Sequence, residues 1–416
     1  MKKRLLVLLL VLATVIASLS SCMYLPFVSG EGDYLTRGEL WNMINGSLLG
    51  DTTVIGGDTN NIYIEGDTDL DDAAASRALL SAVSVYASFK SISSGQLVES
   101  TGAGSGVIYK MNKETGDAYI ITNYHVVHNA RTGGTRANEV YLFLYGQEGL
   151  SKYAIPATYV GGCMQADIAV LKVTGSRILA ESLAVEATLA DSDGARVLDT
   201  AIAVGNPEGR GISATLGHVS VDNEDIELTL DGVNKVKIRV MRIDTAVNEG
   251  NSGGGLFNSR GELIGIVNAK PSDTSIEGIG YAIPSNLVSA VADNIIHYCA
   301  DTSKTSAYRC LLGVTVKISE QYLELDTESG ALLRREKIVV DAISAGGTVD
   351  GVLAVGDELI SVTVDGVEYE ITRLHSIGDA MLRARVGDLV AFKIIRGGVE
   401  TTVTLFMPES ALQEYK

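Results

Sequence analysis

Three short segments of the chain carry the side chains that acyl transfer by a serine nucleophile requires. They contribute one histidine, one aspartate and one serine, in the order His125, Asp167 and Ser252. A serine hydroxyl is a weak nucleophile until a neutral imidazole removes its proton, and a buried carboxylate then orients that imidazole and stabilises its cation. We therefore interpret His125 as the candidate base, Asp167 as its orienting group and Ser252 as the candidate nucleophile.

Glycines surround Ser252 in residues 248–254. They allow a sharp turn in which the backbone N–H groups of Gly250 and Ser252 both point at one developing oxyanion. Taken singly, each of the three segments also has a structural interpretation, because core histidines, turn aspartates and glycine-rich serine loops are all common. The order of the three along one chain carries the prediction.

The elements around these residues read as many short strands separated by glycine turns. The chain has 45 glycines among 416 residues, above the usual ~7%. Apolar and β-branched runs lie at residues 82–86, 106–109, 119–121, 140–144, 168–173 and 263–267. Such spacing predicts a mainly β protein with a barrel or a sandwich. We expect helices only at 285–297 and 376–384, near domain ends.

In its short motifs the sequence resembles the HtrA/Deg family of trypsin-like serine proteases. Six motifs occur in the family's order, at residues 122–127, 167–172, 203–207, 215–220, 250–254 and 278–284. The resemblance implies a chymotrypsin-like double β-barrel over residues 74–300, with no metal and no cofactor. It also implies endoproteolysis of unfolded or extended polypeptides.

Two positions depart from the family's pattern, because the family usually has proline where Glu249 and Gly255 stand. Glu249 places a carboxylate beside the candidate oxyanion hole, and we expect Gly255 to loosen the loop. Neither change removes a catalytic group.

After residue 300 the chain again shows alternating strand patterns with a single helix pattern. The segments at 311–316, 339–343, 356–360, 364–366 and 389–396 carry a second resemblance, in which residues 308–409 resemble a PDZ domain. The resemblance implies that Leu312, Gly313 and Val314 form a loop that binds the carboxylate of a peptide C-terminus, which adds as a strand beside residues 314–318. The apolar groove wall would come from residues 377–382. The alternative is a plain β domain that packs on the protease.

The first 21 residues read as a secretion signal, because a basic start precedes an apolar run and small residues. The segment that ends at Cys22 resembles the lipobox of bacterial lipoproteins, which implies cleavage before Cys22 and lipid on its sulfur. An uncleaved anchor is the alternative. Residues 22–73 are the predicted linker. Ten acidic residues and one arginine lie between residues 31 and 75, a composition that predicts a solvated spacer, either a flexible stalk or a small stack of hairpins.

The composition limits the partners. The chain has 33 basic and 51 acidic residues, a formal charge of −18 that opposes binding to nucleic acid. Three cysteines follow Cys22, and we expect free thiols, although a bridge between Cys299 and Cys310 is conceivable. Members of the HtrA/Deg family commonly form trimers, so the resemblance implies a homotrimer.

These observations predict an extracytoplasmic serine endoprotease, anchored by lipid to a bacterial cell membrane, with polypeptide substrates and peptide C-termini as partners. One alternative is a catalytically inactive adaptor that captures C-termini through the PDZ module. Another is a protease that stays silent until a peptide occupies residues 312–314.

Overall fold

The computed structural model describes most of the chain beyond the acidic segment. The described residues are 53–54, 64–65, 70–93, 96–129, 135–148, 150–230, 235–268, 278–300, 302–327, 330 and 332–415. The leader and Cys22 lie outside them, as does most of the acidic linker. The described parts of the linker are residues 70–73 and one short antiparallel pair, β1 (Thr53–Val54) with β2 (Ile64–Glu65).

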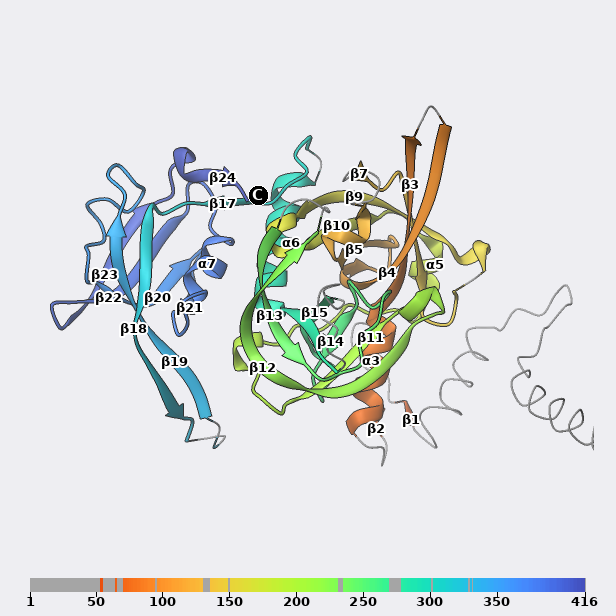
Figure 1. The fold of residues 1–416 in the computed structure, drawn as a ribbon, viewed down its shortest axis with the longest axis horizontal. Coiled ribbons are helices and arrows are strands. Elements are labelled where there is room, and N and C mark those ends of the chain that lie inside the picture. The colour runs from red at the N-terminus through yellow and green to blue at the C-terminus, as the bar shows by residue number, and fades with distance from the viewer. Residues whose placement is uncertain are drawn as a thin grey trace, which may run out of the picture. The chain divides into compact units, whose positions relative to one another are not determined.

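Six antiparallel strands close into the first barrel in the order β10-β5-β4-β3-β8-β9 (Figure 1). They are β3 (Ala82–Ser93), β4 (Gln96–Asn112), β5 (Asp117–Thr122), β8 (Glu139–Leu144), β9 (Ile155–Cys163) and β10 (Ile168–Val173). In β8 every second side chain, Val140, Leu142 and Leu144, is buried, as the period of a strand requires. The predicted barrel is confirmed.

Six further strands close the second barrel in the order β11-β12-β13-β16-β15-β14. They are β11 (Thr200–Gly205), β12 (Ser213–Thr229), β13 (Lys235–Ile243), β14 (Gly255–Phe257), β15 (Leu263–Asn268) and β16 (Gly280–Pro284). Helix α6 (Ser285–Cys299) follows at the predicted start and ends two residues later than expected. The remaining short elements of the two barrels are α4 (Tyr124–Val127), α5 (Arg177–Glu181), β6 (His128–Asn129), β7 (Thr135–Arg136) and the 3₁₀ turns η2 (Ser151–Tyr153), η3 (Met164–Ala166), η4 (Ser192–Gly194) and η5 (Pro207–Gly209).

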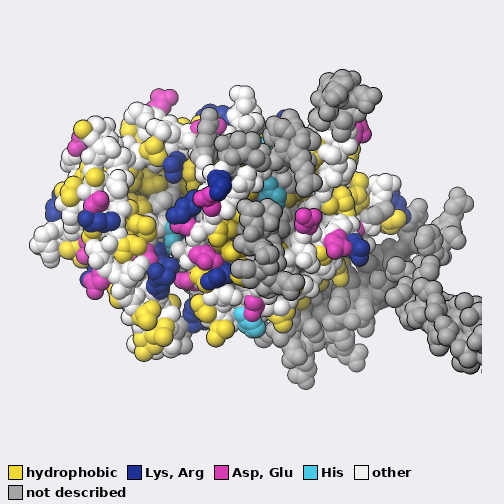
Figure 2. Space-filling view, viewed as in Figure 1, with side chains coloured by type: hydrophobic (Ala, Val, Ile, Leu, Met, Phe, Trp, Pro, Cys, Tyr) yellow, Lys and Arg dark blue, Asp and Glu magenta, His cyan; other side chains and the backbone are white. Residues whose placement is uncertain are grey.

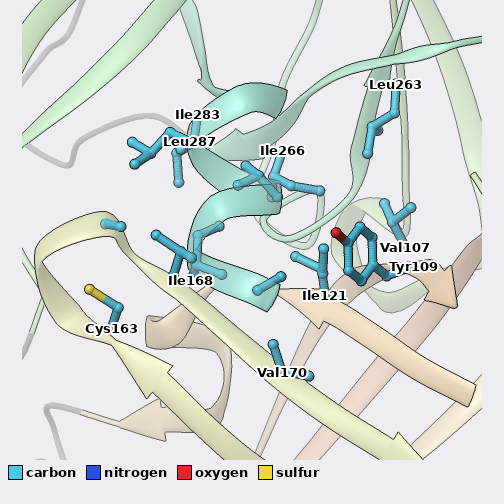
Figure 3. Close-up of a cluster of buried hydrophobic side chains, with 14 of the residues drawn as sticks. Val107, Tyr109, Ile121, Cys163, Ile168, Val170, Leu263, Ile266, Ile283 and Leu287 are labelled. Atoms are coloured by element: carbon cyan, nitrogen blue, oxygen red, sulfur yellow. The ribbon is translucent and has the colours of Figure 1, made fainter. Parts of the chain in front are cut away.

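One apolar cluster joins the two barrels and α6 (Figure 3). Val107, Ile121 and Ile168 enter it from the first barrel, Ile266 from the second and Leu287 from α6. Fully burying such an aliphatic side chain contributes roughly 1.5–3 kcal/mol. The shared core therefore fixes the position of one barrel, and of the side chains on its strand ends, against the other.

Helix α3 (Leu70–Ser81) corrects the expectation that helices lie only at 285–297 and 376–384. Its sequence contains acidic residues at the start and then alanines, which favours a helix. Ala74 and Ala78, one turn apart, are fully buried. The helix was missed because its buried face consists of small residues and gives almost no amphipathic pattern.

The C-terminal domain contains a six-stranded sheet in the order β18-β19-β20-β22-β23, with β21 paired to β20. Its elements are β18 (Val314–Leu325), β19 (Leu332–Ile343), β20 (Glu358–Val364), β21 (Val367–Glu370), α7 (Ser376–Met381), β22 (Leu389–Arg396), β23 (Val399–Phe406) and η6 (Glu409–Ala411). Helix α7 begins where predicted and is three residues shorter than predicted. Beside it, Leu382 belongs to the core cluster of the barrels, which corrects its assignment to the groove wall.

The end of the chain returns to the connection between the domains. Strand β24 (Leu412–Glu414) pairs with β17 (Tyr308–Cys310), and the Tyr415 N–H donates to the Ala307 carbonyl at 2.8 Å. The same connection pairs with Gly162 at the end of β9, because the Gly162 N–H donates to the Thr305 carbonyl at 3.0 Å and its carbonyl accepts from Ala307 N–H at 3.2 Å. Connection, C-terminus and first barrel are thus hydrogen-bonded together.

On the described surface in Figure 2, basic and acidic side chains are interspersed. Half of the net charge of −18 comes from residues 31–75, and most of those charges lie outside the described part. No helix among the described residues has both the length and the apolar character of a membrane span.

The three described cysteines, Cys163, Cys299 and Cys310, are buried free thiols, as expected.

Candidate active site

His125 and Asp167 meet at one end of the first barrel. His125 lies on α4, a single turn that directly follows β5, and Asp167 lies between η3 and β10. The two strands pair, with Thr122 opposite Ala169, so the residues beyond their ends are brought together. One carboxylate oxygen of Asp167 lies 2.7 Å from His125 Nδ1, and the other accepts the His125 backbone N–H at 3.0 Å.

Asp167 is fully buried and its backbone is left-handed, with φ at +50°. Its carbonyl accepts from the Tyr124 N–H at 3.1 Å and from Asn123 Nδ2 at 2.9 Å. Asn268, at the end of β15 in the second barrel, donates from Nδ2 to the Asp167 carboxylate at 2.8 Å. The carboxylate is therefore fixed by groups from both barrels.

The protonation of His125 follows from this arrangement. Burial alone would lower the pKa of His125, but the charge of Asp167 and the hydrogen bond to it outweigh burial and raise that pKa above the ordinary value of 6.5. The side chain of His125 retains 28% exposure, so the ring is not closed off from other groups. This is the environment of a base that becomes a stabilised cation when it takes a proton.

Ser252 lies in the loop between β13 and β14 and is 5% exposed. Its carbonyl accepts from the Ser105 N–H at 2.8 Å, which ties the loop to β4 of the first barrel. The next residue, Gly253, donates its N–H to the Val267 carbonyl at 2.9 Å. Val267 and Asn268 are neighbours on β15. The first accepts a bond from the loop of Ser252, and the second donates to Asp167.

The loop of Ser252 also approaches the segment that leads to His125. A Cβ atom on Gly253 would lie 2.4 Å from Thr122 Oγ1 and 3.0 Å from the Asn123 nitrogen. Gly253 has φ at +85°, which only glycine adopts without strain. The structure thus places the loop of Ser252 against the segment that leads to His125.

The peptide plane between Glu249 and Gly250 is fixed by a bond from the second barrel. The Glu249 carbonyl accepts from the Glu208 N–H at 2.8 Å. Because a trans peptide is planar, the Gly250 N–H points away from that carbonyl, on the opposite side of the peptide. Gly250 has φ at +97°, and a Cβ atom there would lie 2.2 Å from the Asn206 carbonyl oxygen. Only glycine fits this position of the candidate oxyanion hole.

The two departures from the family pattern have different outcomes. Gly255 does not loosen the loop: it begins β14, pairs with Val204 and Ile266, and leaves room for the Phe257 ring, which a Cβ atom would meet at 2.3 Å. Glu249 is exposed, so its carboxylate lies in solvent rather than in the buried part of the site.

Sequence reasoning missed two buried polar residues of this site, Asn268 and Ser105. Asn268 is 2% exposed and Ser105 is fully buried. A signal existed in each case, because each is a polar residue in or beside an apolar run that becomes a buried strand. The partner groups lie far away in the sequence, so the pattern alone could not name them.

The predicted carboxylate loop lies where β18 begins, at the edge of its sheet. Gly313 has φ at +71° and its carbonyl accepts from the Ser344 N–H at 2.8 Å, while the Leu312 carbonyl accepts from Val349 N–H at 3.0 Å. Ile377 and Met381 of α7 share a core cluster with Leu312.

Across the described part of the chain, no cluster of histidine, cysteine and acidic side chains could hold a metal ion.

Comparisons with known proteins agree with this geometry. Residues 104–266 match the family model of a trypsin-like peptidase domain. The chain is 32% identical over 320 residues to "Serine protease Do-like HtrA" of Lactococcus lactis subsp. cremoris (strain MG1363), a match that covers 74% of this chain and 71% of the relative. It is 33% identical over 313 residues to "Periplasmic pH-dependent serine endoprotease DegQ" of Escherichia coli (strain K12), covering 73% and 59%.

A third relative and a solved structure extend the comparison. "Serine protease Do-like HtrA" of Bacillus subtilis (strain 168) is 32% identical over 310 residues, and the match spans 73% of this chain but only 62% of that protein. The solved structure "HtrA-type protease AlgW with tripeptide" is 28% identical, with a TM-score of 0.50, and the match covers 82% of this chain and 96% of that one.

Proposed function

Because the chain belongs to the HtrA family of trypsin-like serine endopeptidases, we propose that it hydrolyses peptide bonds of unfolded or regulatory proteins through His125, Asp167 and Ser252. Ser252 Oγ attacks the scissile carbonyl while His125 takes its proton. Asp167 holds the ring by its Nδ1 and stabilises the imidazolium, and His125 then returns the proton to the leaving amine. The N–H groups of Gly250 and Ser252 receive the oxyanion.

The observation that carries this proposal is the pair of bonds from the buried Asp167 carboxylate to His125, at 2.7 and 3.0 Å. One bond fixes the ring tautomer and the other fixes the backbone of the residue that bears the ring. A buried carboxylate with no such role would be costly, because removing a charge from water must be offset by its partners. An adaptor without catalysis has no need of this arrangement.

A serine-directed fluorophosphonate and unfolded casein test the proposal, with a peptide that ends in a free carboxylate present as an activator. We expect the wild-type chain to be labelled and to cleave casein, and Ser252→Ala to do neither. If the wild type is neither labelled nor active with the activator present, the catalytic proposal is wrong and the adaptor is favoured.

We further propose that residues 308–409 form a PDZ domain that binds peptide C-termini at Leu312, Gly313 and Val314. This is supported by the place of these residues at a free sheet edge within the described chain and by the nearby helix α7. Fluorescence anisotropy with one peptide in two forms tests it. The form with a free C-terminus should bind and the amidated form should not; equal binding of both contradicts the proposal.

We also propose an extracytoplasmic location with lipid attached at Cys22, after removal of residues 1–21, and a homotrimer as the assembly. The location is supported by the relative from E. coli, which is described as periplasmic. Mass spectrometry of the membrane fraction tests the anchor. Cys22→Ala should lose both the added lipid mass and the membrane association, while Cys299→Ala should keep them. Sedimentation of the chain without residues 1–22 tests the trimer.

A further inference from the structure

We propose that Ser105 is a positioning residue for the oxyanion hole, an inference that rests on the proposed function. Ser105 lies on β4 of the first barrel and is fully buried. Its hydroxyl donates to the Gly250 carbonyl at 2.7 Å and accepts the Asn206 N–H at 2.7 Å. Its own backbone N–H donates to the Ser252 carbonyl at 2.8 Å.

The two residues held by Ser105 are the two whose N–H groups would bind the oxyanion. The peptide plane before Gly250 is fixed by Glu208, as described above, and the plane after it is fixed by the Ser105 hydroxyl. Gly250 is the joint between these planes and has φ at +97°, a region that glycine adopts at little steric cost. Without the hydroxyl, only the first plane retains its bond from outside the loop.

Ser105 also connects this loop to the segment of the candidate base. The Ser105 carbonyl accepts from Thr122 Oγ1 at 2.7 Å, three residues before His125. A Cβ atom on Gly253 would lie 2.2 Å from the same carbonyl, so the nucleophile loop packs directly on it. One residue of the first barrel thus sets where the amides of the second barrel stand relative to His125.

Removal of the hydroxyl would take the partner from two backbone groups, the part-buried Gly250 carbonyl and the buried Asn206 N–H. Such groups seek new partners, and rotation of the Gly250 plane is the available response. Complete loss of one oxyanion donor costs about 100- to 1,000-fold in kcat. Because Ser105 acts through Gly250, we expect a smaller loss for Ser105→Ala, about 10- to 100-fold in kcat.

The chain offers a matched control in Ser84. It lies directly opposite Ser105 on the neighbouring strand β3, is also fully buried, and its hydroxyl has no hydrogen-bond partner among the described residues. Ser84→Ala therefore removes the same atom from the same part of the core without releasing any group of the loop. We expect it to retain wild-type kcat within about twofold.

The test measures kcat and KM for a short peptide substrate, together with inhibition by a peptide aldehyde. Ser252 adds reversibly to the aldehyde carbon, the proton passes to His125, and the former carbonyl oxygen becomes the oxyanion. In Ser105→Ala we expect kcat and aldehyde affinity to fall together, with KM changed less than about threefold, because substrate binding does not use the oxyanion in full. A general loosening of the fold would raise KM as well.

Ser105→Cys, which keeps a weaker donor, is the second variant and should fall between wild type and Ser105→Ala. Wild-type kcat and aldehyde affinity in Ser105→Ala, or equal losses in Ser84→Ala, would overturn the inference while the protease proposal stands. A wild-type chain that neither cleaves nor is labelled by a fluorophosphonate overturns the proposed function itself, and this inference with it.

Discussion

The two halves of the candidate site are built by different means. On the His125 side, a charged side chain does the positioning: the Asp167 carboxylate binds the ring and the backbone of the base. On the proposed oxyanion side, the groups that would act are backbone amides, and the loop that bears them is held by Glu208 and Ser105, which donate to its carbonyls. The first half depends on residue identity at the site, and the second on residues that hold the backbone from outside.

The largest expected effect comes from breaking the side-chain half. Asp167→Asn keeps the shape of the side chain but removes its charge and presents the wrong tautomer partner to His125, so we expect kcat to fall about 10⁴-fold. Stopped assays on a peptide substrate measure it. Asp117→Asn, at the start of β5, is the control and should keep its kcat. A loss below about tenfold in Asp167→Asn would contradict the assigned role.

The backbone half is broken by Gly250→Ala, with an expected loss of about 100- to 1,000-fold in kcat. The added methyl would meet the Asn206 carbonyl oxygen at 2.2 Å, so the peptide must rotate. Gly175→Ala separates this clash from backbone strain, because Gly175 also has a positive φ, +63°, but has open space around it. Equal kcat in both variants would mean that the Gly250 amide is not used.

Asn268 tests whether the carboxylate needs its donor from the second barrel. Asn268→Ala leaves the buried Asp167 carboxylate one hydrogen bond short, and a bond to a charged group contributes about 1.5–3 kcal/mol. We expect kcat to fall about tenfold, which corresponds to about 1.4 kcal/mol. Asn258→Ala, which removes only turn contacts with residues 260 and 262, should lower Tm and leave kcat unchanged. The opposite pattern contradicts the role of Asn268.

The smallest effect is a displacement of the pH profile. Catalysis needs neutral His125, and Asp167 raises the pKa of His125 above 6.5, so kcat/KM should rise with pH around a midpoint above that value. In Asp167→Asn the raising influences are gone and burial lowers the pKa, so the residual activity should have a lower midpoint. A flat profile between about pH 5 and 8 under chemistry-limited conditions counts against His125 as the base.

The same contrast explains what could be predicted from the sequence. Short local motifs contain the candidate residues His125, Asp167, Ser252 and Gly250. The strands around them show clear apolar patterns, so the double barrel was predictable. Asn268 lies 101 residues from its partner Asp167, and Ser105 lies 145 residues from Gly250. These contacts exist only after the barrels close. Helix α3 was missed because alanines bury little and leave almost no periodic signal.

His128, outside the three candidate segments, shows the same limit of prediction from local sequence. His128 stacks on Tyr124 with ring centroids 3.9 Å apart, and burial lowers its pKa to about 4. Its distance from His125 in the sequence says nothing of this environment, because the neighbouring Tyr159 ring comes from another strand. Local spacing predicts which residues can do chemistry, while burial by distant segments decides how they titrate.

The pairing of the interdomain connection with Gly162 and with the last residues of the chain changes how domain removal must be done. A truncation at residue 308 deletes the proposed peptide groove together with β24 and Tyr415, whose N–H donates to the Ala307 carbonyl. Thr305 and Ala307 in turn hydrogen-bond to Gly162 of β9, the strand that ends four residues before Asp167. The cut therefore removes hydrogen bonds that hold the segment next to the candidate carboxylate. A single substitution at Gly313, where φ is +71°, is expected to disturb the proposed groove and to leave these hydrogen bonds in place.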